Sequence, residues 1–330
     1  MPWWIILVAI FSYAANAQTR AYHRVERLMG CRFDFTVVAD DAPAGERYLD
    51  LAVGEVRRIE RLISSWDPAS QTSTVNQAAG KGPVVVDHEL FDLIERANAI
   101  SRLTDGAFDI SYASVDSLWQ FDGSMTSLPD SAAVQASVAR VGYRRLRLDS
   151  AAASVFLPER GMKIGFGAIG KGYAADRARA LLEAAGVTAG IINASGDLTA
   201  WGRQPDGQDW RVAITNPLNR ARAFAWLPVV DGAVVTSGSY EKFATFDGVR
   251  YAHIIDPRTG YPGTGIVSAT VLAPRAELAD ALATAVFVMG VDVGLHFINQ
   301  LPGVELVIVD RENQVHTTDG ITLEKPRSDH

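Results

Sequence analysis

Apolar residues recur every three to four positions in several stretches of the chain, which is the spacing that predicts amphipathic helices. The clearest stretch runs from Tyr48 to Ile63, where the apolar side chains fall on one face. A later stretch ends before Gly106, a residue type that commonly follows the C-terminus of a helix. The predicted helices are Tyr48–Ile63, Glu89–Leu103, Leu128–Gly142, Ile169–Ala185 and Leu278–Met289.

Shorter apolar runs bounded by turn residues predict β-strands. Arg20–Ala39 is expected to be a strand pair, or a strand with a turn at Met29-Gly30. Lys242–Ile255 is expected to be a hairpin with Asp247-Gly248 at its turn. The remaining predicted strands are Arg145–Leu148, Ser154–Leu157, Ala189–Asn193, Trp210–Ile214, Phe224–Leu227, Ala233–Ser237, Ile266–Leu272 and Val304–Val309.

The order of these elements predicts the fold class. Phe108–Tyr112 is expected to be extended, and Ser64–Gly82 is expected to be a polar loop. Strands come in runs that are broken by single helices, without the regular alternation of a doubly wound sheet. We therefore expect an α+β fold of mixed sheets with packed helices. No internal repeat or flexible linker divides the chain.

The N-terminal residues form a separate segment. Trp3–Ala15 is apolar but shorter than the roughly 20 residues that a helix needs to cross a bilayer. It ends in Ala15-Asn16-Ala17, the spacing of small residues that signal peptidase cleaves. We expect a signal peptide over residues 1–17 and an extracytoplasmic, periplasmic mature chain over residues 18–330, with no integral membrane segment once cleaved. The alternative is an uncut membrane anchor, since no Lys or Arg precedes the apolar core.

Composition excludes several classes of protein. Of the 330 residues, 31 are Lys or Arg and 38 are Asp or Glu, which gives a net charge of −7. A negative chain with no basic run lacks the charge pattern of nucleic-acid-binding proteins. Cys31 is the only cysteine, which excludes an internal disulfide and a zinc site built on thiolates.

A glycine-rich segment, residues 165–172, leads into the predicted helix Ile169–Ala185. Its glycines fit the dinucleotide motif G-x-G-x-x-G and nearly fit the phosphate-binding motif G-x-x-x-x-G-K-[ST]. The second motif fails at Gly172, which has no hydroxyl for magnesium. The first normally opens a βαβ unit, which is not evident here. What remains is a turn that brings backbone amides to a phosphate, or a turn with no ligand.

Two further groups of residues carry possible chemistry. Asp280 and Thr284 lie four apart at the start of a predicted helix, so their oxygens face one side and could bind Mg²⁺. Taken alone, the pair fits an ordinary helix start better, with Asp280 favouring the helix N-terminus and Thr284 merely packing. His253 follows a predicted strand and can serve as a general base. Arg258 can pair with Asp256 and brace the following turn, which is the structural alternative.

Taken together and in this order, the motifs are specific, and the chain resembles the FAD:protein FMN transferase (ApbE) family over nearly all of its mature length. The most diagnostic segments are TDGAFD at residues 104–109, HIIDPRTGYP at residues 253–262 and ADALAT at residues 279–284. The other matching segments are Met29-Gly30-Cys31, Ser65-Trp66-Asp67-Pro68 with Asn76, Leu118-Trp119, Gly167–Tyr173 with Asp176, Ser195-Gly196-Asp197, and Ser237-Gly238 with Tyr240-Glu241.

The resemblance implies an α+β fold with a flavin cleft in the centre. Members of the family transfer the FMN half of FAD to a threonine of an acceptor redox protein and release AMP, with Mg²⁺ as cofactor. The residues that match family positions at the flavin are Met29, Trp66, Ala107, Phe108, Asp109, Lys171 and Ile255. Those that match the Mg²⁺ site are Ala168, through its carbonyl, and the side chains of Asp280 and Thr284. His253 matches the histidine that would activate the acceptor threonine.

Six positions depart from the family pattern. The family's usual Thr, Gly-Pro, Asp, Gly and Asp are replaced by Cys31, Ala113-Ser114, Gly165, Ser195 and Ser239. The carboxylate that Gly165 replaces contacts FAD in the family, so we expect weaker FAD binding here. The alternatives are an FAD pyrophosphatase that uses water, a flavin-binding protein without transfer activity, and a nicotinamide-dependent oxidoreductase based on G-x-G-x-x-G alone.

Overall fold

The structure is a computed structural model that describes residues 19–215, 223–240, 243–246 and 249–321. The predicted signal peptide, residues 1–17, and the predicted turn at Asp247-Gly248 lie outside the described residues. Within the described part of the chain, no helix combines the length and the hydropathy that a bilayer span requires.

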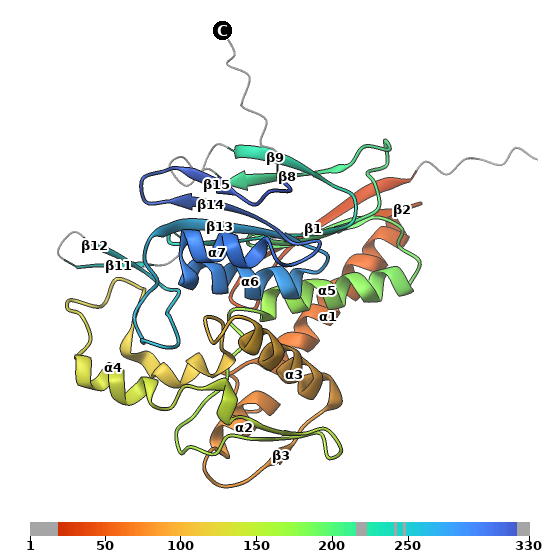
Figure 1. Ribbon diagram of the computed structural model, residues 1–330. Helices are drawn as coiled ribbons and strands as arrows, with labels where there is room; N and C mark the ends of the chain where they lie inside the picture. The colour runs from red at the N-terminus through yellow and green to blue at the C-terminus, as the bar shows by residue number, and fades with distance from the viewer. Residues whose placement is uncertain (1–18, 216–222, 241–242, 247–248, 322–330) are drawn as a thin grey trace, which may run out of the picture.

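The centre of the fold is an antiparallel sheet of eight strands in the order β1-β2-β6-β7-β10-β13-β14-β15 (Figure 1). β1 and β2 pair with Leu28 opposite Cys31, and the connecting Met29 and Gly30 have positive φ angles of 51° and 73°. The predicted strand pair and its turn are therefore confirmed. The bounds are β1 Arg20–Leu28, β2 Cys31–Ala39, β6 Gly190–Ala194, β7 Asp197–Trp201, β10 Gly232–Gly238, β13 Ile266–Ala273, β14 Glu305–Asp310 and β15 Val315–Thr317.

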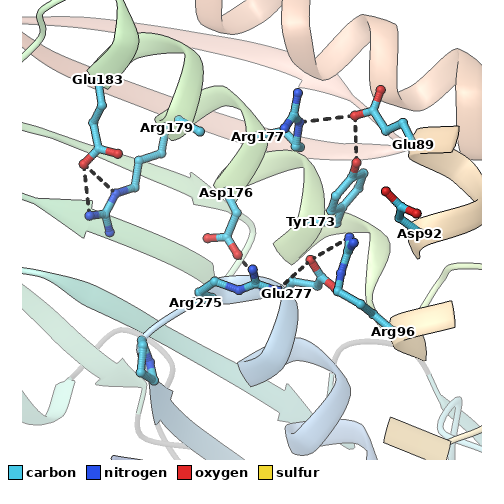
Figure 2. A pocket seen from close by; sticks show the side chains of 12 residues that line it. Glu89, Asp92, Arg96, Tyr173, Asp176, Arg177, Arg179, Glu183, Arg275 and Glu277 are labelled. Carbon is cyan, nitrogen blue, oxygen red and sulfur yellow. Dashed lines mark hydrogen bonds and ion pairs between the residues drawn. The ribbon is translucent and has the colours of Figure 1, made fainter. Parts of the chain in front are cut away.

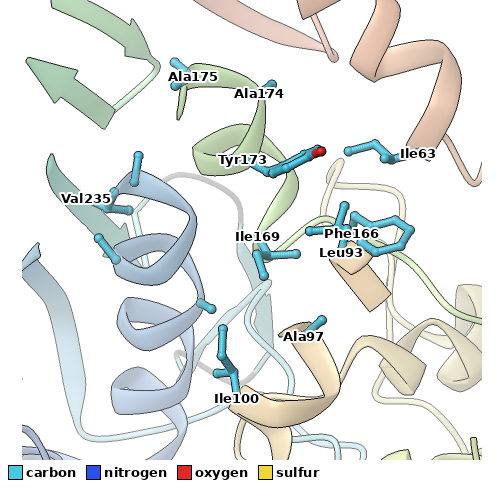
Figure 3. Close-up of a cluster of buried hydrophobic side chains, with 14 of the residues drawn as sticks. Ile63, Leu93, Ala97, Ile100, Phe166, Ile169, Tyr173, Ala174, Ala175 and Val235 are labelled. Carbon is cyan, nitrogen blue, oxygen red and sulfur yellow. The ribbon is translucent and has the colours of Figure 1, made fainter. Parts of the chain in front are cut away.

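One face of this sheet is covered by helices (Figure 1). They are α1 (Ala42–Ile63), α5 (Gly170–Ala184), α6 (Ala276–Met289) and α7 (Val291–Ile298). The main core lies between sheet and helices because apolar residues alternate along the strands: Phe33, Phe35 and Val37 of β2 are all fully buried. Figure 3 shows a part of this core where side chains of α1, α3 and α5 meet, among them Ile63, Leu93 and Tyr173.

The opposite face of the sheet is covered by a hairpin of β8 (Trp210–Thr215) and β9 (Ala223–Val229), drawn above the sheet in Figure 1. The indole N–H of Trp210 donates to the carbonyl of Trp201 at 3.0 Å, and Trp210 packs with Leu198 in a second, smaller core. A sheet packed on both faces explains why every residue of β7 is buried.

Most of the remaining elements lie on the far side of the helical layer from the sheet, whereas the hairpin of β11 (Phe243–Phe246) and β12 (Val249–Ala252) lies at the left of Figure 1, level with the sheet. The elements on the far side are α2 (Gln71–Gln77), α3 (His88–Leu103), α4 (Ser131–Val138), the 3₁₀ helices η1 (Ile110–Leu118) and η2 (Tyr143–Arg145), and the three-stranded sheet of β3 (Val84–Val85), β5 (Ser154–Phe156) and β4 (Arg147–Asp149).

Most predicted elements are confirmed, and three predictions are wrong for local reasons. Helix α1 begins at Ala42 instead of Tyr48, because the Asp41 side chain accepts from Ala44 N at 2.7 Å and caps an earlier turn. The expected loop 64–82 contains α2, which Ser70 caps in the same way. The expected extended segment 108–112 instead enters η1. Strands β3, β7 and β15 and helix α7 were not predicted.

Candidate functional site

Three charged side chains from distant parts of the chain meet where α5 and α6 approach the sheet. Lys171 lies in the first turn of α5, Asp197 begins β7, and Asp280 lies in the second turn of α6. Lys171 forms an ion pair with Asp197. The carboxyl groups of Asp197 and Asp280 lie close enough to influence each other's charge, and both residues are almost completely buried. We call Lys171, Asp197 and Asp280 the charged cluster.

A close approach between the two helices positions Asp280. The backbone N–H of Gly172 on α5 donates to Asp280 Oδ2 at 3.2 Å. A Cβ on Gly172 would lie 2.2 Å from the carbonyl oxygen of Ala276, so only glycine allows α6 to pass this close. Gly172 is therefore needed for the packing of α5 on α6, and its N–H also positions the Asp280 carboxylate in the cluster.

The charged cluster contains two acidic side chains and one basic side chain, and both acidic side chains are buried. Burial raises the pKa of Asp197, although the Lys171 ammonium opposes the rise. Burial raises the pKa of Asp280 well above its usual range, and the charge of Asp197 raises it further. Two ionised carboxylates would face one ammonium, so the cluster is completed by a proton or by a further cation.

The donors around the cluster fit a hard divalent cation. Thr284 lies one helical turn beyond Asp280 and is half-buried, and Ala168 is half-buried in the turn before α5. Carboxylate, hydroxyl and carbonyl oxygens are the ligands that Mg²⁺ prefers, usually together with water and substrate phosphates. Within the described ranges, no group of three or more His, Cys, Asp or Glu side chains forms a metal site. A cation here would thus need oxygens from the backbone, from hydroxyl groups or from a ligand.

One residue expected at the flavin lies near the start of α5. Met29 donates its backbone N–H to Glu60 at 2.9 Å, and its Cε lies 3.6 Å from the position of a Cβ on Gly170. Trp66 is 94% exposed, in a loop whose backbone N–H groups bond to Ser64 Oγ. The indole of Trp66 therefore offers an open aromatic face, and Oγ of its neighbour Ser65 lies 3.8 Å from the position of a Cβ on Gly165.

The segment Ala107-Phe108-Asp109 is buried and makes its contacts within the protein. Phe108 is 1% exposed and belongs to the main core, so its ring has no free face to offer to a flavin. The Asp109 carboxylate begins η1, accepting from Ser111 N at 2.8 Å and from Tyr143 N at 2.8 Å. Contacts from this segment to a flavin would have to come from its backbone.

His253 lies in a separate aromatic group. It follows β12, and its ring meets that of Phe121 edge-on, with centroids 6.4 Å apart. Phe121 stacks on Trp119, which donates its indole N–H to Gly260 O at 2.9 Å. Ile255 pairs with Pro262 in an isolated β-bridge and packs in the same small core. The aromatic group around His253 therefore shares no residue with the charged cluster.

The other side chains of the HIIDPRTGYP segment have structural roles. Arg258 donates to both oxygens of Asp256, at 2.9 and 3.0 Å, which confirms the pair that braces the turn. Gly263, just after the segment, donates its N–H to Ile254 O at 2.9 Å. A Cβ on Gly263 would lie 3.1 Å from Phe287 O, so the segment packs directly on α6.

Sequence reasoning missed Asp197 and Tyr112 as site residues. Asp197 is the one charged residue of a strand that is buried throughout, and a lone acid at the start of an apolar strand is a signal that could have found it. Tyr112 lies in η1, and its hydroxyl oxygen lies 2.6 Å from the position of a Cβ on Gly167. Nothing in the local pattern around Tyr112 indicates this contact.

Two of the departures from the family pattern touch each other. A Cβ on Gly165 would lie 3.2 Å from Ala113 Cβ, so Ala113 occupies space beside the position of the missing carboxylate. The hydroxyl of Ser195, by contrast, bonds to the backbone N–H and carbonyl of Arg32 at 3.1 and 2.9 Å. The hydrogen bonds of this hydroxyl are therefore made to β2.

A second polar region lies on the outer side of α5, where a cavity of about 600 Å³ opens between α3, α5 and the start of α6 (Figure 2). Its arginines are paired: Arg96 with Glu277 at 2.6 Å, and Arg177 with Glu89 at 3.2 Å. None of the residues expected at the flavin or the metal lines this cavity. These ion pairs connect helices, and the candidate site is the charged cluster.

Comparison with known proteins gives a consistent result. The ApbE family matches residues 29–308. The chain is 33% identical to an FAD:protein FMN transferase of Treponema pallidum, over 96% of this chain and 92% of that protein. It is 32% identical to one of Klebsiella pneumoniae, over 91% of this chain and 92% of that protein.

Solved structures agree with the fold. The crystal structure of the ApbE protein of Thermotoga maritima is similar with a TM-score of 0.84 and 31% identity, over 91% of this chain and 97% of that chain. The apo flavinyl transferase ApbE of Pseudomonas stutzeri is similar with a TM-score of 0.81 and 26% identity, over 91% of this chain and 95% of that chain. The expected α+β fold is therefore confirmed, and the chain belongs to the ApbE family.

Proposed function

We propose that this protein is an Mg²⁺-dependent FAD:protein FMN transferase, which moves FMN from FAD to a threonine of an acceptor redox protein and releases AMP. Family membership supports the proposal, because the relatives that it matches over most of their length are enzymes of that name. The observation that carries it is the charged cluster, in which Lys171, Asp197 and Asp280 are gathered at the start of α5.

The residues of the cluster suit the cleavage of a pyrophosphate. Asp280, Thr284 and the carbonyl of Ala168 would hold Mg²⁺, which when bound would neutralise charge developing on the pyrophosphate. Lys171 is 27% exposed and lies in the first turn of α5, so its ammonium can reach an anion at a helix start. Met29 lies near the start of α5 and Trp66 offers an open aromatic face, and both would contact the flavin.

His253 is proposed as the general base of the transfer. The threonine oxygen of the acceptor attacks the phosphorus of the FMN half, and the bond from that phosphorus to the bridging oxygen breaks. The threonine proton passes to His253, and AMP leaves with the bridging oxygen. A positioned base typically contributes about 10²–10⁴-fold to such a rate.

The proposal includes an extracytoplasmic location. The A-x-A pattern at residues 15–17 supports export of the mature chain, which would begin at Gln18. Expression of the full chain followed by fractionation and N-terminal sequencing tests this step. A mature N-terminus at Gln18 in the periplasmic fraction is expected, and an intact N-terminus in the membrane fraction would identify an uncut anchor instead.

Intact-mass measurement tests the transfer itself. The purified mature chain is mixed with FAD, Mg²⁺ and candidate acceptor domains, and the acceptor should gain the mass of one FMN while AMP accumulates. His253→Ala should lose transfer at saturating acceptor but bind FAD normally. FMN and AMP without a labelled acceptor would identify the protein as an FAD pyrophosphatase. Bound but uncleaved FAD under all conditions would identify it as a flavin-binding protein without transfer activity.

A further inference from the structure

The hydroxyl of Tyr112 lies beside the candidate site and has no role in the function proposed above. Tyr112 belongs to η1 and is half-buried. Its oxygen lies against the backbone of Gly167, in the turn before α5. A Cβ at position 167 would lie 2.6 Å from this oxygen, so glycine is required for the contact.

Tyr112 is held at this point by a chain of contacts between η1 and the glycine-rich turn. The backbone N–H of Gly165 donates to Ile110 O at 2.9 Å. Ser114 Oγ accepts from the backbone N–H of Lys163 at 2.8 Å and donates to the carbonyl of the same residue at 3.1 Å. These bonds lie on both sides of Tyr112 in the sequence, so the position of its ring follows that of the turn.

The hydroxyl can donate a hydrogen bond to a ligand. A tyrosine hydroxyl, whose ordinary pKa is about 10, keeps its proton at physiological pH. The group that it offers to an anionic ligand is therefore this proton. The hydroxyl also lies near the carboxyl group of Asp280.

An O–H donor at this position complements an anion at the start of α5. Lys171 and the N-terminal N–H groups of α5 favour negative charge at the same place. We propose that the Tyr112 hydroxyl donates a hydrogen bond to the pyrophosphate of FAD. This contact would lie near Gly165, the position at which the family usually has an Asp that contacts FAD. This inference rests on the proposed function, because it takes FAD as the ligand.

The test is titration of the Tyr112→Phe variant, which lacks only the hydroxyl, with FAD. Binding is measured by flavin fluorescence, with and without Mg²⁺. We expect the dissociation constant for FAD to rise about tenfold, the effect of losing one hydrogen bond to a charged group. Riboflavin, which has no phosphate, should bind the variant and the wild type equally. The loss should persist without Mg²⁺, because the hydroxyl contacts the phosphate directly.

Tyr173→Phe is the matched control. The Tyr173 hydroxyl donates to Glu89 at 2.7 Å on the other side of α5, so this variant should bind FAD like the wild type. FAD binding by Tyr112→Phe within twofold of wild type would overturn the inference alone. An equal loss of affinity for FAD and for riboflavin, with an unchanged thermal melt, would also overturn the inference. Such a result would mean that the substitution changes the shape of the pocket and not a contact to phosphate. A wild-type protein that binds no FAD would overturn both the inference and the proposed function.

Discussion

The carboxylate of Asp176 on α5 accepts a hydrogen bond from the backbone N–H of Ala276, the first residue of α6, at 3.0 Å. Its second oxygen accepts from Glu277 N at 2.9 Å. The residue at the N-cap position of α6, Arg275, makes no side-chain capping bond. Helix α6 is therefore capped by a neighbouring helix, and this bond ties the element that carries Lys171 to the element that carries Asp280.

Asp176→Asn should reduce the pH dependence of the free energy of unfolding. Burial raises the pKa of Asp176 to about 6, above the roughly 3.9 of a carboxyl in an unfolded chain. The folded protein thus binds the proton of the Asp176 carboxyl more tightly than the unfolded chain does. The protonated carboxyl therefore stabilises the folded state below about pH 4, and this stabilisation is lost as the pH rises through about 6. Urea denaturation should show the wild-type value falling relative to the Asn variant by about 2 kcal/mol between those pH values. Asp292→Asn, at an exposed position, should keep the wild-type profile.

Gly172→Ala should separate α5 from α6 and disable the cluster. The new Cβ would lie 2.2 Å from Ala276 O, and a backbone atom cannot turn aside as a side chain can. Overpacking of this kind typically costs about 1–3 kcal/mol, measurable by urea denaturation. Gly54→Ala in α1 is the control, because no atom lies within 4 Å of its Cβ position; it should stabilise the protein by about 0.5–1 kcal/mol. Equal behaviour of the two variants would contradict the packing argument.

Asp280→Asn should abolish the response to Mg²⁺ without unfolding the protein. The substitution keeps the size of the side chain and removes one of two buried like charges, so the metal-free variant should melt no lower than the wild type. Wild-type Tm should rise with Mg²⁺ concentration, because a ligand that binds the folded state stabilises it. A variant that retains this rise would show that the cation does not bind at Asp280. Asp292→Asn serves as the control here as well.

Gly165→Asp alone should not improve FAD binding. Its Cβ would lie 3.2 Å from Ala113 Cβ, closer than such atoms normally approach, so the new carboxylate would displace η1. The double variant with Ala113→Gly removes the obstructing methyl and should bind FAD about tenfold tighter than Gly165→Asp alone. Flavin fluorescence titration measures both, with Ala113→Gly as the control. Tight binding by the single variant would mean that Ala113 moves aside without cost.

Local patterns in the sequence predicted most of the helices and strands, and they also predicted the family of the protein. The helix over residues 48–63 and the strand pair around Met29-Gly30 depend on spacing and turn residues that lie close together in the chain, and the structure confirms both. The ordered set of motifs, with TDGAFD, HIIDPRTGYP and ADALAT the most diagnostic, predicted membership of the ApbE family, which the comparison confirms. Where prediction of an element failed, as at Ala42 and in α2, a short-range cap had been overlooked.

The tertiary structure alone decided which side chains form the site. Lys171, Asp197 and Asp280 are separated by up to about a hundred residues, and no periodicity encodes a contact between elements that are so far apart. Burial was decided in the same way: two aromatic residues that look alike in the sequence became the fully buried Phe108 and the exposed Trp66. The physical reason is that side-chain contacts and desolvation depend on how the helices pack on the sheet, whereas the chain's local pattern specifies only which face of each element is apolar.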